Sequence, residues 1–509
     1  MPARIFHYPA ASRSGQRLMV LRPNGSHDEI PTSGPLMVLS GAAPALWLVL
    51  GLKLVAILAY GIMNSTLVLW LSADLGYSDT RAGFLIAAWS TMLSLCTVLV
   101  GSFTDAVGLR RALLLGFGIC VVARAVMTFA PAASIALPFG LLPLAFGEAL
   151  LTPVMVVAVK RYTTTRQRSM AFSIFYVAMN LGFAGAGFVF DGVRGGLGEH
   201  GAYTVPILGL SLSTYRTLFF LSTLTTLAGL LLLGLGLRGP GNGEPPRPIL
   251  SEGPSTGTPR ALVDAVREVL GETRRIFAGL WRQPAFYRFL AFLTLVVGVR
   301  LIFYHMFYTF PKYAIRELGP GAPIGQLFGV LNSTLIILLV PLCGVLTQKA
   351  SAYRMVTLGS LIAASSVFFI ALPPEIYAPL AQGPFGRLIG HGWLGLEGAV
   401  HPLYVGIVLF VFFLSLGEAL WSPRLYEYTA AIAPEGQEGS YMALSVLPFF
   451  IAKLFVGMLS GFLLTTYCPE TGPRDCREMW LIIGAMAMIT PIGLVTFRRF
   501  LQTGQARSD

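Results

Sequence analysis

Long apolar runs separated by short polar segments dominate the chain from residue 46 to residue 497. Each run is about 20 residues long, which is the length that an α-helix needs to cross a bilayer. Membrane-spanning β-strands would be about 10 residues long with alternating polarity, whereas these runs are longer and continuous. The pattern predicts an all-α membrane protein with twelve spanning helices, at 46–71, 82–104, 111–130, 136–159, 169–190, 217–237, 289–310, 323–347, 353–372, 402–428, 439–466 and 478–497.

A polar segment at 238–285 divides these helices into six and six. It opens with RGPGNGEPPRP, a composition typical of a flexible linker. Residues 259–282 then place apolar side chains on one side of a helix and arginines on the other, which predicts an amphipathic helix on the cytoplasmic leaflet. The predicted parts are a cytoplasmic tail (1–45), a first six-helix bundle (46–237), the linker (238–285), a second six-helix bundle (286–500) and a second cytoplasmic tail (501–509).

Composition supports a membrane protein, because 55% of the 509 residues are hydrophobic and 12% are charged. A soluble domain carries about 25% charged residues. The net charge of +12 raises the alternative of nucleic-acid binding. Most of the 36 Lys and Arg residues, however, fall in the segments on the same side of the membrane as the N-terminus, so the positive-inside rule accounts for the excess. Both termini are predicted to be cytoplasmic, no nucleic-acid partner is expected, and the polar residues 1–45 do not resemble a signal peptide.

One short sequence occurs twice inside predicted membrane helices. Residues 147–153 read GEALLTP, and residues 417–423 read GEALWSP. Each copy places a glutamate where a charge costs about 3 kcal/mol or more, so Glu148 and Glu418 are functional candidates. A repeated acid at matching positions indicates two related halves around a shared site, as in many transporters.

The loop between the second and third helices reads GSFTDAVGLRR at 101–111. This segment resembles the cytoplasmic signature of the major facilitator superfamily, and a reduced copy, GVLTQKASAYR, follows the eighth helix at 344–354. The resemblance implies two pseudo-symmetric six-helix bundles that transport a solute by alternating access. The residues expected to close the cytoplasmic gate are Asp105, Gly108, Arg110, Arg111, Lys349 and Arg354.

Four patches resemble a narrower family, the proton-dependent oligopeptide transporters. Residues 175–182 read FYVAMNLG, similar to the family's Phe-Tyr-x-x-x-Asn-x-Gly signature. The patch at 417–423 and the residues that follow it resemble the family's tenth helix, and 60–71 resembles its first. The chain departs from the family in two places. Leu52, Val55 and Ala56 stand where the family has a Glu-x-x-Glu-Arg run, and Thr152 replaces the lysine of its Lys-Pro pair.

Polar and charged residues inside the apolar runs supply the candidate site. The resemblance implies that Glu418 holds a substrate ammonium group, and Ser422 lies one turn further on the same helix face. An arginine or lysine suits a substrate carboxylate. The substrate-binding candidates are Glu418, Lys53, Arg300, Asn180, Tyr60, Ser422 and Trp421, and the proton-coupling candidates are Glu418, Glu148 and His305.

Each candidate also has a purely structural interpretation. The glutamates could pair with Arg124, Arg300 or Lys453 simply because buried charges must be compensated. Asn180 could hydrogen-bond between helices. A lone histidine among aromatic residues, such as His305, and the aromatic residues themselves could serve packing alone.

Five cysteines are present, and two of them, Cys468 and Cys476, share the predicted outward loop between the last two helices. An oxidising exterior would allow a disulfide there, the alternative being two unpaired thiols. Nucleotide-binding loops, metal-ligand spacings and catalytic constellations are not found in the sequence. An enzyme, a metal site, a cofactor and an obligate protein partner are therefore not expected, and the proton gradient is the expected energy source.

These observations predict a secondary transporter for the proton-coupled uptake of short peptides or peptide-like zwitterions. The alternative is an exporter of amphipathic small molecules by proton antiport, and a receptor that moves no solute is a weaker one. Frequent Gly and Arg residues favour a bacterial source, so the expected location is the bacterial cytoplasmic (inner) membrane.

Overall fold

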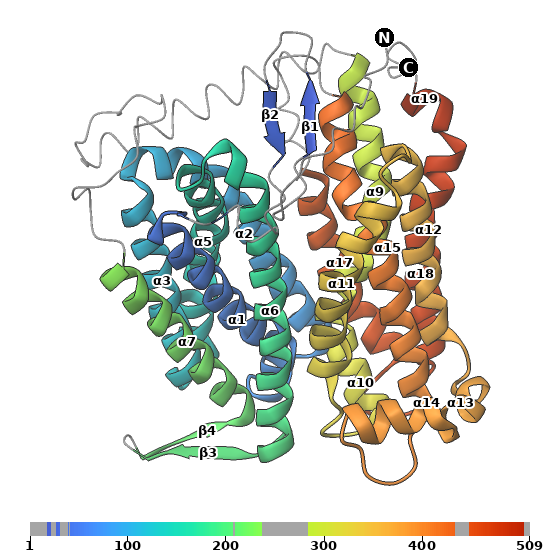
Figure 1. The fold of residues 1–509 in the computed structure, drawn as a ribbon. Helices are drawn as coiled ribbons and strands as arrows, with labels where there is room; N and C mark the ends of the chain where they lie inside the picture. Colours follow the sequence, from blue (N-terminus) through green and yellow to red (C-terminus); the bar gives the residue numbers. More distant parts are fainter. Residues whose placement is uncertain are drawn as a thin grey trace, which may run out of the picture.

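The structure is a computed structural model that describes residues 18–21, 27–30, 39, 41–206, 209–236, 284–432 and 447–502. These residues are almost entirely helical (Figure 1). The predicted amphipathic helix at 259–282 and most of the predicted tails lie outside the described residues. Near the N-terminus, β1 (Leu18–Leu21) and β2 (His27–Ile30) form an antiparallel pair.

The elements of residues 44–236 make up the first half of the molecule. In chain order they are α1 (Pro44–Ala73), α2 (Asp79–Val107), α3 (Leu109–Phe129), α4 (Ala133–Ile135), the π-helical η2 (Ala136–Leu141), α5 (Leu142–Arg161), α6 (Thr165–Leu197), β3 (Ala202–Val205), β4 (Leu210–Ser213) and α7 (Thr214–Gly236).

The elements of residues 284–502 make up the second half. They are α9 (Pro284–Tyr308), α10 (Phe310–Leu318), η3 (Gly325–Val330), α11 (Leu331–Leu346), α12 (Ala352–Ala371), η4 (Pro374–Tyr377), α13 (Ala378–Gln382), α14 (Pro384–Arg387), η5 (Leu388–Trp393), α15 (Leu403–Ile432), α17 (Leu447–Tyr467), α18 (Cys476–Thr496) and α19 (Arg498–Gln502).

Ten helical segments of the described residues are long and apolar enough to cross a membrane. The 29-residue helix α2 and the apolar helix α17 pack along each other beside them. The chain is therefore a multi-pass integral membrane protein, and the predicted all-α class with twelve spanning helices is confirmed. Large apolar side chains such as Leu346, 74% exposed, and Phe455, 65% exposed, cover the outside of the helices, as a lipid environment requires.

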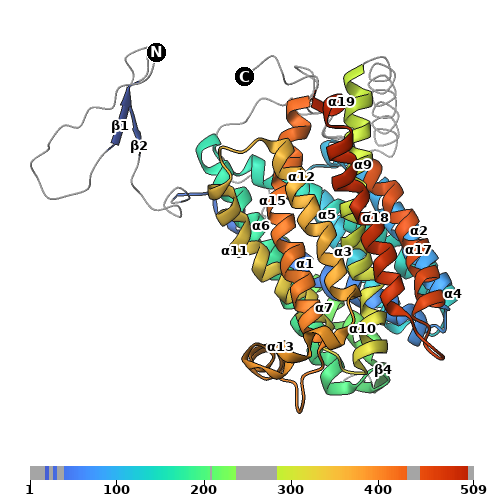
Figure 2. The ribbon, with the colours of Figure 1, turned by 90° about the vertical axis from the view of Figure 1, so that its right-hand side faces the viewer.

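The helices end at two opposite faces of the molecule, and both faces can be seen in Figure 1 and in Figure 2. We call the face at which α1 begins and α18 ends the terminal face. The opposite face carries the antiparallel hairpin of β3 and β4 and the short helices α13 and α14, and we call it the loop face. Because the spanning helices alternate in direction, each one begins on the face where its predecessor ends.

The two halves meet mainly at two places. At one, α2 packs against α17; at the other, α6 packs against η3 and α11. Glycines make these contacts close. A Cβ atom on Gly83 would lie 2.4 Å from the carbonyl oxygen of Gly457, and one on Gly187 would lie 2.4 Å from that of Gly325. Helices in a bilayer associate through small residues of this kind. The hydrophobic effect does not drive helices together in lipid, so close packing of the backbones supplies the attraction.

Local signals set several helix ends. The side chain of Ser78 accepts a hydrogen bond from Arg81 N–H and caps the start of α2. Thr164 and Gln167 form a reciprocal capping box at the start of α6. Gly108 separates α2 from α3 with φ at +87°, a conformation that glycine adopts without steric cost.

Candidate functional site

A cavity of about 150 Å³ lies between the two halves, and we call it the central cavity. Its walls come from α1 and α6 of the first half and from α9, α10, η3, α11 and α15 of the second. Aromatic side chains line much of it, namely Tyr176, Phe183, Phe190, Phe303, Phe307 and Phe328. The polar groups among the lining residues are those of Ser65, Tyr176, Asn180, Asn332, Ser333 and Glu418.

Glu418 is the one carboxylate among the described residues that line the central cavity. The side-chain amide of Asn332 donates to Ser415 Oγ at 2.9 Å and to Glu418 Oε2 at 3.4 Å. Arg300 on α9 interacts electrostatically with Glu418, and its guanidinium lies 5.3 Å from the ring centroid of Trp421. Within the described part of the chain Glu418 forms no ion pair closer than 4 Å, so this carboxylate can exchange partners.

Glu148 has a different environment, although its sequence context is nearly the same. It is ion-paired with Arg124 of α3, which is fully buried and also donates to Thr226 of α7. The thiol of Cys120 lies 3.8 Å from the same carboxylate oxygen. Glu148 does not line the central cavity. This pair joins three helices inside the first half.

Glycine contacts show that the two glutamates occupy equivalent positions. A Cβ atom on Gly116 of α3 would meet the carbonyl of Gly147, and one on Gly359 of α12, 243 residues on, would meet the carbonyl of Gly417. The residue 243 positions after Arg124 is Val367, which is buried. The second half therefore has an apolar residue where the first half has the arginine that neutralises Glu148.

Two lysines lie within spanning helices of opposite halves, and neither they nor Arg300 line the central cavity. Lys53 of α1 is 1% exposed, donates to Thr152 Oγ1 at 3.1 Å and lies 4.8 Å from the ring centroid of Phe175. Lys453 of α17 donates to Ser94 Oγ at 3.2 Å. Neither ammonium group has a carboxylate within 4 Å among the described residues. Thr152, which stands at the position of the family's usual lysine, is thus in direct contact with the ammonium group of Lys53.

The other predicted binding residues divide by location. Asn180 lines the central cavity and donates to the carbonyl of Tyr176 at 2.9 Å. Tyr60 packs edge-on against Phe183, with ring centroids 6.3 Å apart. Trp421 is fully buried, and Ser422 is half-buried; neither lines the cavity.

His305 is fully buried, and its Nδ1 lies 2.8 Å from the hydroxyl of Thr309 on the next turn. It does not line the central cavity. This environment is typical of a structural histidine.

Asn332 was missed by the sequence reasoning, as were Ser65 and Ser333. Asn332 and Ser333 interrupt the apolar run LFGVLNSTLIILLV, so an isolated polar pair within a predicted span was a usable signal. The aromatic lining residues carried no such signal, because aromatic residues also fill ordinary helix contacts.

The predicted gate residues lie on the terminal face. Arg110, Arg111, Lys349 and Arg354 are exposed. Arg110 donates to the carbonyl of Gly234 at 3.4 Å, within its own half. Asp105 lies in α2, where its side chain is not among those described, and Gly108 follows at the end of that helix. No contact between the halves is found for the four basic residues in the described structure.

The loop face, in contrast, joins the halves by polar contacts that we call the loop-face network. Asp79 at the start of α2 is paired with Lys312 at 2.5 Å and with Arg316 at 2.9 Å, both from α10. Asp191 of α6 accepts hydrogen bonds from the backbone N–H groups of Gly325 and Gln326 at 2.9 and 2.6 Å. These contacts hold the two halves together on the loop face.

Two further contacts of the loop-face network involve the end of α6. Arg194 is ion-paired with Glu199 and donates to the carbonyl of Ala322 at 2.9 Å. Glu199 in turn accepts from the backbone N–H of Gly321 at 3.1 Å. Buried charges on one half thus hold backbone groups of the other.

The structure contains a disulfide between Cys468 and Cys476, whose Cα atoms are 4.9 Å apart. It closes the loop between α17 and α18 on the loop face. Glu317 lies close to both sulfurs, but disulfide-bonded cysteines do not supply the thiolates that a metal ion needs.

Two helix bundles with a cavity between them that carries a few polar groups are the architecture of a secondary transporter. The chain belongs to the major facilitator superfamily, because the model of that family matches residues 49–390. A comparison with curated proteins finds no match. The resemblance recognised in the sequence is confirmed for the superfamily.

Solved structures with the same fold include those of peptide transporters. A peptide transporter POT in complex with sulfate is 18% identical, with a TM-score of 0.65, 92% of this chain covered and 99% of that one. A POT family transporter in complex with 5-aminolevulinic acid is 16% identical, with a TM-score of 0.64 and coverage of 90% and 96%. These structures share their fold with the chain, as the narrower sequence resemblance predicts.

Proposed function

We propose that the chain is a proton-coupled importer of short peptides or peptide-like zwitterions. The observation that carries the proposal is the position of Glu418, a carboxylate without an ion pair on the wall of the central cavity within the described structure. A partly buried carboxylate of this kind suits the ammonium group of a substrate. Its equivalent, Glu148, is already neutralised by Arg124.

The remaining charges suit the other end of a zwitterion. Lys53, Arg300 and Lys453 are basic residues of the spanning helices α1, α9 and α17, and they do not line the central cavity in the arrangement of the halves that the structure shows. A guanidinium or ammonium group can bind a carboxylate, and the aromatic walls can accept apolar side chains. Structures of the same fold hold 5-aminolevulinic acid and a thioalcohol conjugated peptide, which is consistent with this substrate class.

Proton coupling is assigned to Glu418 as well. Apolar residues stand in the first helix where the related family has its Glu-x-x-Glu-Arg run. Glu418 would alternate between binding substrate as a carboxylate and carrying a proton when the substrate leaves. No bound cofactor is needed for this cycle, because the proton gradient supplies the energy.

The orientation follows from the positive-inside rule. We place the chain in a bacterial cytoplasmic membrane, with the terminal face in the cytoplasm and the loop face outside. In this orientation the loop-face network closes the outer side. The predicted gate of Asp105, Arg110, Arg111, Lys349 and Arg354 would close the inner side in the other half of the cycle.

The test is uptake of a labelled dipeptide into proteoliposomes with and without an inward proton gradient. Wild type should show gradient-stimulated uptake, and Glu418→Gln should lose it. The matched control is Glu375→Gln, which changes an exposed glutamate on the loop face and should transport normally. Absence of dipeptide uptake by folded wild-type protein would refute the peptide proposal, and proton-driven export of an amphipathic label would establish the exporter instead.

A further inference from the structure

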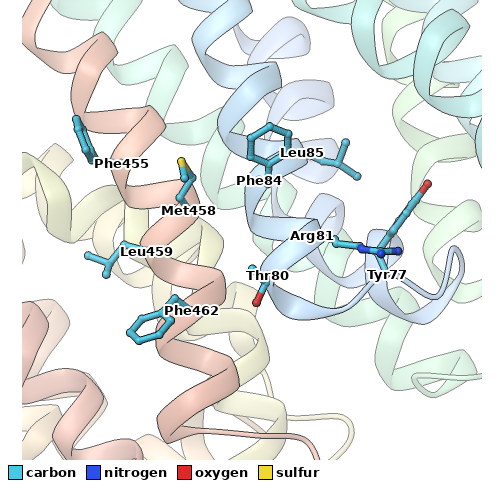
Figure 3. A pocket seen from close by; sticks show the side chains of 9 residues that line it. All are labelled: Tyr77, Thr80, Arg81, Phe84, Leu85, Phe455, Met458, Leu459 and Phe462. Carbon is cyan, nitrogen blue, oxygen red and sulfur yellow. The ribbon is translucent and has the colours of Figure 1, made fainter.

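A second, larger cavity of about 780 Å³ lies between α2 and α17, away from the central cavity (Figure 3). We call it the α2–α17 groove. Phe84 and Leu85 of α2 line it together with residues of α17, and none of the described residues lines both cavities. The α17 residues are Phe455, Met458, Leu459 and Phe462. Phe84, Phe455 and Phe462 are each more than half exposed, so the groove opens to the lipid-facing surface.

The apolar part of the groove follows α17 near the end of that helix on the loop face. Phe455 and Phe462 are seven residues apart, which is about 10 Å along a helix. One leaflet of the hydrocarbon core is about 15 Å thick. The end near Phe462 lies close to the loop face, where α17 ends at Tyr467 and α2 begins at Asp79. An extended acyl chain therefore matches both the direction and the chemistry of the groove.

The end of the groove near the start of α2 is polar. Tyr77, Thr80 and Arg81 line it (Figure 3). Arg81 is exposed, and its guanidinium has no ion pair or hydrogen bond within the part of the chain that the structure describes. The neighbouring carboxylate of Asp79 does not neutralise it, because Lys312 and Arg316 already bind that carboxylate. The groove thus joins an apolar channel to an uncompensated cation at the membrane surface.

We propose that the α2–α17 groove binds an anionic phospholipid of the leaflet on the loop face. One acyl chain lies against Phe84, Phe455 and Phe462, and the phosphate group is held by Arg81. A guanidinium is the preferred partner of a phosphate, because its donors match two phosphate oxygens. The site does not depend on the proposed peptide substrate.

The position of the groove gives the lipid a consequence for transport. Helix α2 belongs to the first half and α17 to the second, and they touch through Gly83, Gly457 and Gly461. A ligand that contacts both helices in one arrangement of the halves favours that arrangement. The bound lipid therefore stabilises the arrangement in which the loop-face network is closed.

The test is native mass spectrometry of the full-length protein with phosphatidylglycerol or phosphatidylcholine added, which gives an apparent affinity for each lipid. Wild type should bind phosphatidylglycerol more tightly. Arg81→Gln should reduce that preference about fivefold, the effect of one basic residue near an anionic surface. Phe84→Ala should weaken the binding of both lipids. Both residues are exposed, so the variants should fold normally.

Matched controls come from the same face of the molecule. Arg477→Gln removes an exposed arginine from the first turn of α18, and Phe139→Ala removes an aromatic ring that is 64% exposed in η2. Neither should change lipid affinity. An unchanged preference in Arg81→Gln, or an equal loss in Arg477→Gln, would overturn the proposal, because the lipid would then respond only to general surface charge or to none.

Discussion

At the residue scale, the two copies of the GEAL sequence show how one element can serve two purposes. Gly147 and Gly417 have the same structural role. Gly147 lets α5 approach α3 closely, and Gly417 lets α15 approach α12 closely. The following glutamates differ because Arg124 stands beside one and Val367 occupies the equivalent place beside the other. One glutamate is thereby ion-paired inside the first half, and the other lines the central cavity.

Arg124→Leu should destabilise the protein by about 3–5 kcal/mol, because it leaves the carboxylate of Glu148 buried without its partner. Replacing both residues by leucine should recover most of that loss. Unfolding in detergent, followed by circular dichroism, measures the difference. Glu418→Gln should change stability little, and a larger loss in Glu418→Gln than in Arg124→Leu would contradict the division of roles.

Acidification should act on Glu199, which lies beyond the end of α6. Burial raises the pKa of this carboxyl, but the hydrogen bonds and charge of Arg194, with the Tyr215 hydroxyl and Gly321 N–H, hold it below its ordinary value of 4.5. A lowered pKa contributes stability that is present above the ordinary value and is lost as the pH falls through the folded pKa.

The prediction is that thermal stability falls more steeply below pH 4.5 in wild type than in Glu199→Gln. Melting temperatures of both proteins over a series of acidic buffers give the comparison. Parallel curves would show that Glu199 makes no contribution. The variant should be less stable than wild type at neutral pH, because it loses the charge that pairs with Arg194.

At the element scale, glycines determine which helices lie against each other. A Cβ atom on Gly417 would lie 2.6 Å from both the carbonyl oxygen of Gly359 and the backbone nitrogen of Ala363. These neighbours are main-chain atoms, so they cannot move aside as a side chain could. The α12–α15 contact, and with it the position of Glu418, depends on the missing side chain.

Gly417→Ala should therefore cost about 1–3 kcal/mol of stability, the usual effect of overpacking. Gly344→Ala is the matched control, because Gly344 lies in α11 and a Cβ atom there would meet nothing within 4 Å. Melting temperatures of the two variants should differ clearly. Equal melting temperatures would show that α12 and α15 can separate without penalty.

At the scale of the whole molecule, the ion pairs that the described residues form between the halves lie on the loop face, and the four basic residues of the predicted gate do not contact the opposite half in the described structure. Alternating access requires these contacts to break and others to form on the terminal face. Asp79 is central to the closure, because one carboxylate binds both Lys312 and Arg316.

Asp79→Asn should open the loop face in part of the population. Spin labels at the exposed residues Thr204 and Glu397 report the distance between the halves there. The distance distribution should broaden toward longer values in the variant. Arg474→Gln is the control, since Arg474 is paired with Glu317 inside the second half and its loss should leave the distribution unchanged.

The amino-acid sequence by itself determined the membrane class, the twelve spans and the superfamily. These properties follow from local features: the length of each apolar run, the side on which basic residues gather, and short signatures in the loops. The same local reasoning singled out Glu418 and Asn180, because a polar group in an apolar helix is costly wherever it lies. It also singled out Glu148 and His305, because an ionisable group in an apolar helix costs free energy there too. The structure places both outside the central cavity.

Only the tertiary structure decided which of these residues share a site. Whether a buried glutamate is neutralised depends on a neighbouring helix, and the sequence does not show that Arg124 faces Glu148 while Val367 takes its place in the second half. The pairing of Asp79 with Lys312 joins residues 233 positions apart. Contacts of this kind depend on how helices pack, which short-range patterns do not encode, and they decide where the cavity lies and which face is closed.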